Sequence, residues 1–303
     1  MDNMTAKVSC FARAYHYKKN RVHIFKDSAA ELLLGNEYEQ IAENMINGIS
    51  FFLPGFEGTK EEGLRLIVDN QLSPSVLGRS AFCEKMLETE KEHGCKQYII
   101  FASGYDTYSL RNEDKALSVF ELDLPELIAD KMDRIKEIGH RTDAVFVPCN
   151  LAEKTWKEKL LQSGYIPTQK SFGSLLGISY YLGKGEFKSL LQTVSELMVE
   201  DSVICFDYPS EEESRESKTN RLLAMGAGEQ MKAMYSDLEI EELLSRCGFE
   251  ITTYLNHDEL SKQYFSAYNH DNKAYAMKAP VGVGYILAKR KTTCRNKLPV
   301  GNK

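Results

Sequence analysis

The chain has 303 residues, of which 43% are hydrophobic and 27% charged, and its formal net charge is −6. This composition is typical of a globular protein with one large domain, and the negative charge argues against a nucleic-acid partner and against an anionic membrane surface. No stretch reaches the ~18 apolar residues of a transmembrane helix, and residues 1–10 contain no apolar core of the signal-peptide type.

Helical patterns without a strand pattern occupy residues 1–92, which we interpret as a helical cap beside a sheet. A short helical stretch is expected at 63–70, and the Ser73–Pro74 pair predicts a turn. The other helices expected in this region are Lys7–Tyr17, Asp27–Leu34 with Asp27 or Ser28 as its N-cap, and Ser80–His93.

From residue 93 onward, short apolar runs alternate with helical segments, which predicts a doubly wound α/β domain over 93–290. The sheet is expected to be mostly parallel with helices on both faces, and its last two strands to form an antiparallel edge. A charged insertion at about 209–235 is either an exposed excursion or a lid over a substrate pocket, and a basic tail follows at 291–303. The seven expected strands are Gln97–Phe101, Leu117–Leu122, Ala144–Cys149, Ser171–Ser179, Ser202–Tyr208, Phe249–Leu255 and Gly282–Lys289.

The seven cysteines are scattered along the chain, and none forms a C-x-x-C pair. This pattern favours buried, reduced thiols over a disulfide framework or a zinc site, so we expect no metal centre. Reduced thiols and the missing signal-peptide core together predict a cytoplasmic protein.

The most informative stretch is Tyr98–Asp123, where two apolar runs flank the small-residue turn Ala102-Ser103-Gly104. The second run ends in the acidic residues Glu121 and Asp123, and Asp123 lies nineteen residues after Gly104. A tight turn after one strand and a carboxylate at the end of the next are typical of a βαβ unit that binds a nucleotide through its ribose hydroxyls.

The turn departs from the G-x-G-x-x-G pattern, because Ala102 and Thr107 stand in the places of the first and third glycines. A dinucleotide pyrophosphate needs close backbone approach over the whole turn, whereas a ligand without phosphates needs less. S-adenosyl-L-methionine is such a ligand. Its ribose would lie against Asp123, and its amino-acid tail beside Gly104, where no side chain blocks the approach.

The run F-A-S-G-Y-D-T-Y-S-L-R, followed by F-E-L-D-L-P-E-L-I-A-D-K, resembles the leucine carboxyl methyltransferase family and its bacterial relatives. The resemblance extends in order over residues 7–290, and it implies a Rossmann-like class I methyltransferase that uses S-adenosyl-L-methionine. Further matching positions are Ser9-x-x-Ala12-Arg13-Ala14, Arg79, Asn150-Leu151 with Trp156-x-x-x-Leu160, and Tyr181-Leu182.

The resemblance also implies a cofactor site, in which Arg79 pairs with the cofactor carboxylate and Arg13 helps to hold the tail. Three positions differ from the family pattern: Ala102 replaces a glycine, Asn150 an aspartate and Leu176 a glutamate. The remaining implied contacts are Ala102, Ser103 and Gly104 at the methionine end, Asp123 and Leu124 at the ribose, Asn150 and Leu151 at the adenine, and Leu176 after the fourth strand.

No catalytic residue is indicated by the sequence, because none of the six histidines lies at a strand end in the sheet. A carboxylate is already ionised at neutral pH and needs no general base, whereas an alcohol or phenol does. We therefore expect a carboxylate acceptor on a small molecule or peptide. Tyr180 and Tyr208 follow predicted strands and are candidate acceptor contacts, although ordinary aromatic packing explains them equally well.

Two alternatives stay open at this point. The three departures from the family pattern are compatible with a non-catalytic protein that binds the same cofactor or a protein partner. A nicotinamide-dependent dehydrogenase is the second alternative, and the incomplete glycine pattern argues against it.

Overall fold

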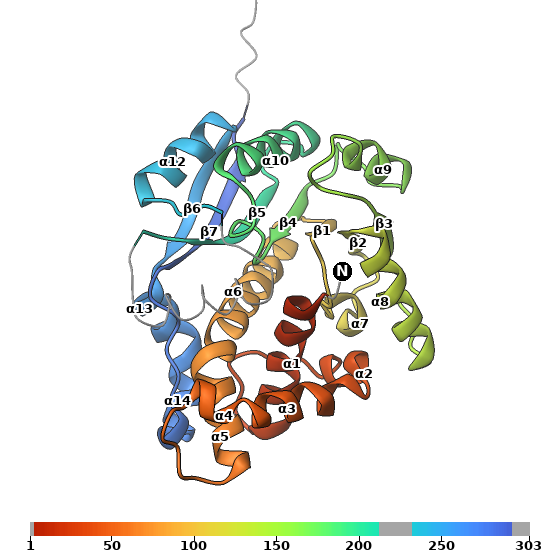
Figure 1. The fold of residues 1–303 in the computed structure, drawn as a ribbon. Coiled ribbons are helices and arrows are strands. Elements are labelled where there is room, and N and C mark those ends of the chain that lie inside the picture. The colour runs from red at the N-terminus through yellow and green to blue at the C-terminus, as the bar shows by residue number, and fades with distance from the viewer. Residues whose placement is uncertain (1–2, 212–231, 293–303) are drawn as a thin grey trace, which may run out of the picture.

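The computed structural model describes residues 3–211 and 232–292, and its centre is a seven-stranded sheet with the strand order β3-β2-β1-β4-β5-β7-β6 (Figure 1). All neighbouring strands are parallel except for β7, which is antiparallel to both β5 and β6. This confirms the predicted mostly parallel sheet. The strands are β1 Gln97–Phe101, β2 Ser118–Asp123, β3 Val145–Pro148, β4 Ser171–Leu175, β5 Val203–Pro209, β6 Phe249–Leu255 and β7 Val283–Arg290.

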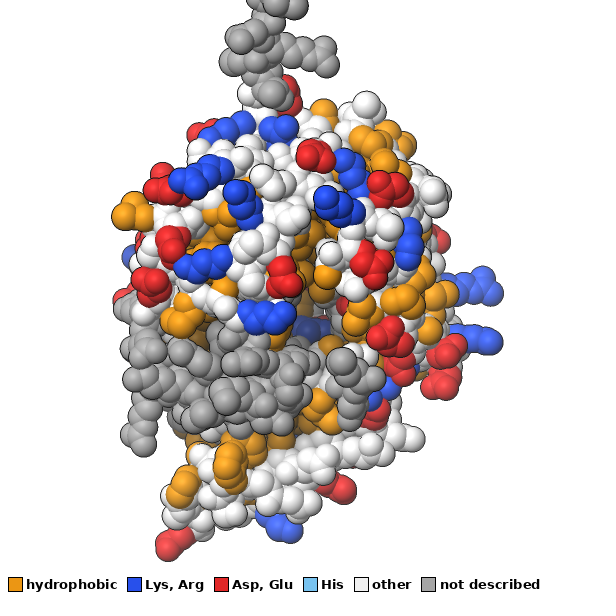
Figure 2. Space-filling view, turned by 45° about the horizontal axis from the view of Figure 1, so that its top comes forward, with side chains coloured by type: hydrophobic (Ala, Val, Ile, Leu, Met, Phe, Trp, Pro, Cys, Tyr) orange, Lys and Arg blue, Asp and Glu red, His pale blue; other side chains and the backbone are white. Residues whose placement is uncertain are grey.

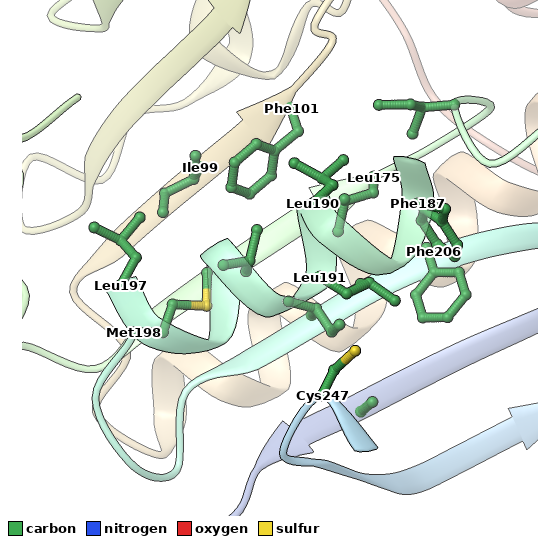
Figure 3. Close-up of a cluster of buried hydrophobic side chains, with 14 of the residues drawn as sticks. Ile99, Phe101, Leu175, Phe187, Leu190, Leu191, Leu197, Met198, Phe206 and Cys247 are labelled. Carbon is green, nitrogen blue, oxygen red and sulfur yellow. The ribbon is translucent and has the colours of Figure 1, made fainter. Parts of the chain in front are cut away.

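The central strand β1 is buried on both faces, because helices cover the sheet from either side. Ile99 and Phe101 belong to one hydrophobic core, and the alternating residues Tyr98 and Ile100 belong to the other. Figure 3 shows α10 over the first core, with its apolar side chains facing those of the strands. The helices between β1 and β6 in the described part of the chain are α7 Tyr108–Arg111, α8 Pro125–Glu137, α9 Trp156–Gln162, α10 Lys184–Leu197 and α12 Asp237–Arg246.

The N-terminal helices gather on one side of the sheet, where Figure 1 shows them in red and orange. The expected turn at Ser73–Pro74 is wrong, because α6 begins there directly after η1, with Pro74 in its first turn. These helices are α1 Met4–Lys19, α2 Ala30–Leu34, α3 Glu37–Asn47, α4 Ile49–Phe52, α5 Lys60–Ile67, the π-helical turn η1 Val68–Leu72 and α6 Ser73–Glu92.

The last two strands form the expected antiparallel pair at one edge of the sheet, with β7 next to β5 and β6 outermost. The segment that connects β6 to β7 is mainly helical. Its elements are α13 His257–Leu260, the π-helical turn η2 Ser261–Phe265, α14 Ser266–Asp271 and the 3₁₀ turn η3 Lys273–Tyr275.

The expected insertion at 209–235 and the tail at 291–303 lie largely outside the described residues, which leave out 212–231 and 293–303. The six cysteines within the described ranges are all buried and free, while Cys294 lies outside them. Over the same ranges, no helix combines the length and apolarity that a bilayer crossing needs.

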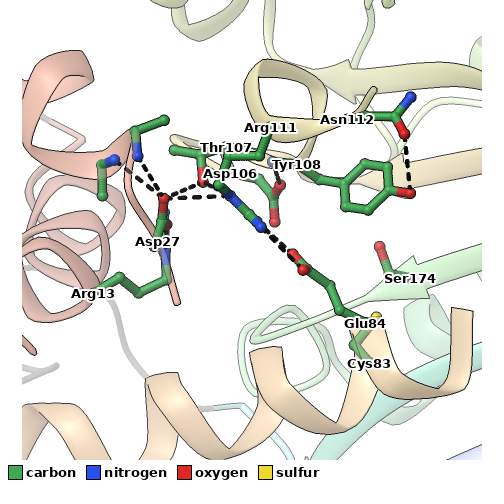
Figure 4. Close-up of polar contacts among 12 residues, drawn as sticks. Arg13, Asp27, Cys83, Glu84, Asp106, Thr107, Tyr108, Arg111, Asn112 and Ser174 are labelled. Carbon is green, nitrogen blue, oxygen red and sulfur yellow. Dashed lines mark hydrogen bonds and ion pairs between the residues drawn. The ribbon is translucent and has the colours of Figure 1, made fainter. Parts of the chain in front are cut away.

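A buried carboxylate joins the N-terminal helices to the turn after β1 (Figure 4). Asp27 is 1% exposed and accepts hydrogen bonds from Arg13 Nε at 2.7 Å and from Thr107 Oγ at 2.6 Å. It also accepts the backbone N–H groups of Ala29 and Ala30. The N-cap residue of α2 is nevertheless Ala29, so the predicted N-cap at Asp27 or Ser28 is wrong.

The charge balance around Asp27 keeps it ionised. Burial acts to raise its pKa, but the guanidinium groups of Arg13 and Arg111 and the Thr107 hydroxyl outweigh burial, so the pKa lies below its ordinary value. Arg111 in turn pairs with Glu84 of α6. One carboxylate thus connects α1, α7 and, through Arg111, α6.

Replacing Asp27 with Asn is expected to lower the free energy of unfolding by roughly 3 kcal/mol, because the buried guanidinium of Arg13 loses its counter-charge and Arg111 keeps only Glu84. Urea denaturation followed by circular dichroism measures the change. The matched control is Asp143→Asn. Asp143 pairs with Lys115, and the two side chains are 78% and 77% exposed, so removing this carboxylate should leave the free energy of unfolding unchanged. Equal destabilisation by the two variants would contradict a central role for Asp27.

Candidate active site

Two adjoining cavities lie where β1 and β4 end, next to the point at which the strand order reverses. The first has a volume of about 530 Å³ and is lined by α1, α6 and the segments that follow β1, β2, β3 and β4. The second has a volume of about 360 Å³ and is lined by α1, η1, α6 and the start of β7. The wall common to both is formed by Thr5, Ser9, Arg79, Gly177 and Tyr181.

The surface of the molecule is hollowed on the face shown in Figure 2. Hydrophobic side chains lie in the depth of this hollow, and charged side chains of both signs surround it. Such a combination of apolar lining and a few polar groups is typical of small-molecule sites.

The turn after β1 has an unusual backbone. Both Ala102 and Gly104 have positive φ, at 52° and 50°, and a left-handed alanine costs about 1–2 kcal/mol. A Cβ placed on Gly104 would meet Ala6 Cβ at 3.3 Å and no other atom within 4 Å. Between them, the Ser103 hydroxyl is buried and has no hydrogen-bond partner among the described residues. The turn therefore leaves open backbone and one unused polar group at the first cavity.

Asp123 closes this turn from the neighbouring strand. Its carboxylate accepts the backbone N–H of Gly104 and that of Leu124, both at 2.7 Å. Burial raises the pKa of Asp123, and the two backbone hydrogen bonds act in the opposite direction without cancelling that rise. Each carboxylate oxygen has a second acceptor position, so Asp123 can still accept two hydroxyl groups from a ligand.

The other acid of β2 has a structural role. Glu121 is fully buried and pairs with Lys131 of α8, which is also fully buried. This pair attaches α8 to the sheet, and it leaves Asp123 as the β2 carboxylate that faces the first cavity.

The far side of the first cavity is mainly apolar. Leu151 and Leu176 line it together with Leu182, and Asn150 lies at the end of β3. The side-chain oxygen of Asn150 accepts the backbone N–H of Ala152 at 3.0 Å, and its amide nitrogen donates to Glu153 at 3.3 Å. Both contacts stabilise the loop after β3. An apolar surface beside an amide suits a planar heteroaromatic ring.

Two arginines line the first cavity in different ways. Arg13 is already engaged, since it donates to Asp27 and to the backbone oxygen of Tyr105 at 2.6 Å. Arg79 lies in the wall common to both cavities, and its NH1 is 3.6 Å from Asp207. A guanidinium has five donors, so this contact leaves Arg79 able to bind an anion.

Asp207 was not singled out from the sequence. It lies near the end of β5, is completely buried, and accepts the backbone N–H of Gly177 at 2.7 Å and the hydroxyl of Tyr180 at 3.0 Å. A single acid within the otherwise apolar run V-I-C-F-D-Y is the signal that could have identified it. Asp207 orients Arg79 at the common wall and Tyr180 in the second cavity.

The two tyrosines predicted to contact an acceptor have different surroundings in the structure. Tyr180 lines the second cavity. Tyr208 lines neither cavity, so its predicted role needs correction: it is completely buried in the first core, and its hydroxyl donates to Asp237 at 2.6 Å. The two residues Asp207 and Tyr208 point to opposite faces of β5, and Tyr208 takes the face covered by α12.

All ten residues predicted to contact the cofactor line the first cavity, although they come from six separate segments. The chemistry of the lining fits S-adenosyl-L-methionine. Asp123 can accept ribose hydroxyls, the leucines can flank the adenine, and the open backbone at Gly104 with the unpaired Ser103 hydroxyl can accommodate the amino-acid tail. The individual contacts stay predictions.

Comparison with known proteins identifies the family. The model of the leucine carboxyl methyltransferase family matches residues 6–195. The chain belongs to this family. It is 34% identical, over 95% of its own length and 98% of the relative's, to a Bacillus subtilis (strain 168) protein provisionally named an S-adenosyl-L-methionine-dependent methyltransferase, YktD.

Solved structures support the fold. A methyltransferase-like protein from Thermobifida fusca YX matches with a TM-score of 0.56 at 11% identity, covering 95% of this chain and 94% of its own. A DUF574 family protein from Streptomyces avermitilis matches with a TM-score of 0.55, also at 11% identity, over 82% of this chain and 97% of its own. With the family match, these findings confirm a Rossmann-like methyltransferase that depends on S-adenosyl-L-methionine.

Cofactor binding is expected to depend on the ionised form of Asp123, because a carboxylate accepts hydroxyl hydrogen bonds better than a carboxylic acid does. Since burial raises the pKa of Asp123, affinity for S-adenosylhomocysteine should fall on acidification at a higher pH than for an ordinary aspartate, whose pKa is about 3.9. Calorimetric titration across the acidic range measures this dependence.

Two variants test the assignment to Asp123. Asp123→Asn should bind more weakly at neutral pH and lose this pH dependence, whereas the exposed Asp133→Asn on the same helix–strand unit should retain the wild-type profile. An unchanged profile in Asp123→Asn would show that another group controls binding.

Proposed function

We propose that this methyltransferase acts on a carboxylate oxygen of a small molecule or peptide. The second cavity supports this choice of acceptor. Among the described residues that line it, none is an aspartate, glutamate, histidine or lysine, and Arg79 alone carries a charge. A cavity with this lining offers a guanidinium to an anion and lacks an ordinary general base, which suits an acceptor that is already ionised.

The tyrosine that lines this cavity does not supply a base. Burial, above all, raises the pKa of the Tyr180 phenol well above its ordinary value, and the nearby carboxylate of Asp207 raises it further. Tyr180 therefore stays protonated and donates its proton to Asp207. Its hydroxyl fixes the wall between the cavities rather than removing a proton from the acceptor.

When bound, S-adenosyl-L-methionine supplies a methyl group on a positively charged sulfur, and its transfer to a carboxylate oxygen gives a methyl ester and a neutral thioether with no proton to move. The chain's own residues position the reactants. Asp123 holds the ribose, the β1 turn accommodates the amino-acid tail, Arg79 holds negative charge at the common wall, and the apolar lining of the second cavity excludes water. Such positioning is sufficient for large rate effects in reactions that need no acid or base.

Methyl esters hydrolyse in mild alkali, whereas methyl ethers and N-methyl groups do not, so the product distinguishes acceptor classes. The purified chain should transfer a labelled methyl group from S-adenosyl-L-methionine to acidic metabolites or peptides, and the label should be released as volatile methanol by base. At saturating cofactor the turnover rate should be independent of pH between about 7 and 9, because the acceptor carboxyl titrates near pH 4.

Variants separate this proposal from its rivals. Tyr180→Phe should keep most of the turnover, because loss of a true general base costs about 10²- to 10⁴-fold. Base-stable label, or a rate that rises steeply with pH, would contradict a carboxylate acceptor. Binding of S-adenosylhomocysteine without any methyl transfer to extracts would favour the non-catalytic alternative.

A further inference from the structure

The second cavity differs from the first in its chemistry, and this difference indicates what it binds. We infer that it binds an elongated, apolar monocarboxylic acid, with the carboxylate at Arg79 and the hydrocarbon body extending toward Gln71. This inference assigns Arg79 to the acceptor, in place of the contact with the cofactor carboxylate that the family resemblance implied. This inference rests on the proposed function, because it treats the second cavity as the acceptor site of a carboxyl methyltransferase.

Apolar side chains form most of the cavity wall. Those contributed by the described residues are Met4, Val8, Met45, Phe52, Ile67, Leu72, Val76, Met234, Val281 and Val283, with Pro209 and Pro280. A cavity of about 360 Å³ lies within the range of about 300–1,000 Å³ that is usual for small-molecule sites. Methionines adapt to ligands of varied shape, so this lining suits a flexible hydrocarbon chain.

Three of the polar side chains that line the cavity follow one face of a single helical rod. Gln71 belongs to the π-helical turn η1, which continues directly into α6, and Ser75 and Arg79 follow at intervals of four residues. Residues four apart lie on the same helix face, and eight residues rise by about 12 Å. Arg79, at the common wall, and Gln71 therefore lie about 12 Å apart along the rod.

The two ends of this face differ in charge. Arg79 has a guanidinium that can pair with a carboxylate next to the first cavity. Gln71 is neutral, and its Oε1 is buried without a hydrogen-bond partner among the described residues. A buried acceptor without a partner is costly, so a hydroxyl or amide N–H at the far end of a ligand would stabilise the complex.

A second negative charge at the far end is disfavoured. No cation from the described residues lines the cavity besides Arg79, so a dicarboxylic acid would have to bury one carboxylate among apolar side chains. An acidic peptide meets the same penalty. The lining thus selects acids with one charge and an uncharged tail.

Calorimetric titration of the full chain in the presence of S-adenosylhomocysteine tests the ligand class without turnover. Decanoate and ω-hydroxydecanoate are expected to bind, with ω-hydroxydecanoate at least as tight. Butyrate has little hydrocarbon to bury, and the dicarboxylate decanedioate would bury a second charge. Both should therefore bind at least about tenfold more weakly than ω-hydroxydecanoate. Equal affinity for decanedioate and ω-hydroxydecanoate, or no binding of any acid longer than butyrate, would overturn the inference.

A pair of neighbouring phenylalanines provides matched variants. Phe52 lines the cavity, whereas the side chain next to it, Phe51, is 73% exposed and lines neither cavity. Phe52→Asp should weaken decanoate binding at least about tenfold and leave the affinity for S-adenosylhomocysteine unchanged, while Phe51→Asp should change neither. Phe52→Leu should restore decanoate binding, and identical behaviour of the two Asp variants would contradict the assignment.

The outcomes separate this inference from the function on which it rests. If the chain forms base-labile methyl esters on other acids but decanoate and ω-hydroxydecanoate do not bind, only the ligand class is wrong. If these acids bind as expected but no base-labile methyl group is formed, the carboxyl methyltransferase proposal is wrong.

Discussion

The buried carboxylate of Asp27 is the interaction on which both cavities depend. It holds Arg13 of α1 and Thr107 of the β1 turn in one charge network, and α1 also contributes Thr5 and Ser9 to the wall common to the two cavities. Arg13 also donates to the backbone oxygen of Tyr105, so the network fixes α1 to this turn at two points. Burial makes the network costly to break, because Arg13 and Asp27 are both buried and each would lose its counter-charge.

The two cavities divide the chemistry by polarity. The first has the open turn at Gly104 and the carboxylate of Asp123, and these suit a ligand with hydroxyl groups and a charged tail. The second is apolar, and its one charged group among the described residues, Arg79, stands at the boundary. Asp207 and Tyr180 keep that guanidinium in place. Because of this division, a single anion-binding group, Arg79, is sufficient for a reaction that requires no proton transfer.

The departures from the family pattern prove informative once the geometry is known. Ala102 keeps the left-handed conformation that a glycine would take, and the turn closes on Asp123 as expected. Leu176 offers no charge after β4, but the register of β4 with β5 pairs Leu175 with Phe206, so the buried acid Asp207 lies one position further along the neighbouring strand. The acid at this wall comes from β5, and no local pattern in β4 could indicate it.

The sequence by itself determined the strands and their mostly parallel arrangement, because strand period and turn chemistry are local properties. The resemblance to the family implied ten of the residues that line the first cavity. Tertiary structure alone decided the rest. It placed Asp207 beside Arg79, turned Tyr208 into the core, and inserted β7 between β5 and β6. It also aligned Gln71, Ser75 and Arg79 along one apolar cavity. These outcomes depend on which face of a helix or strand is buried and on which other elements cover it. Only the packing of residues that are distant in the chain decides this.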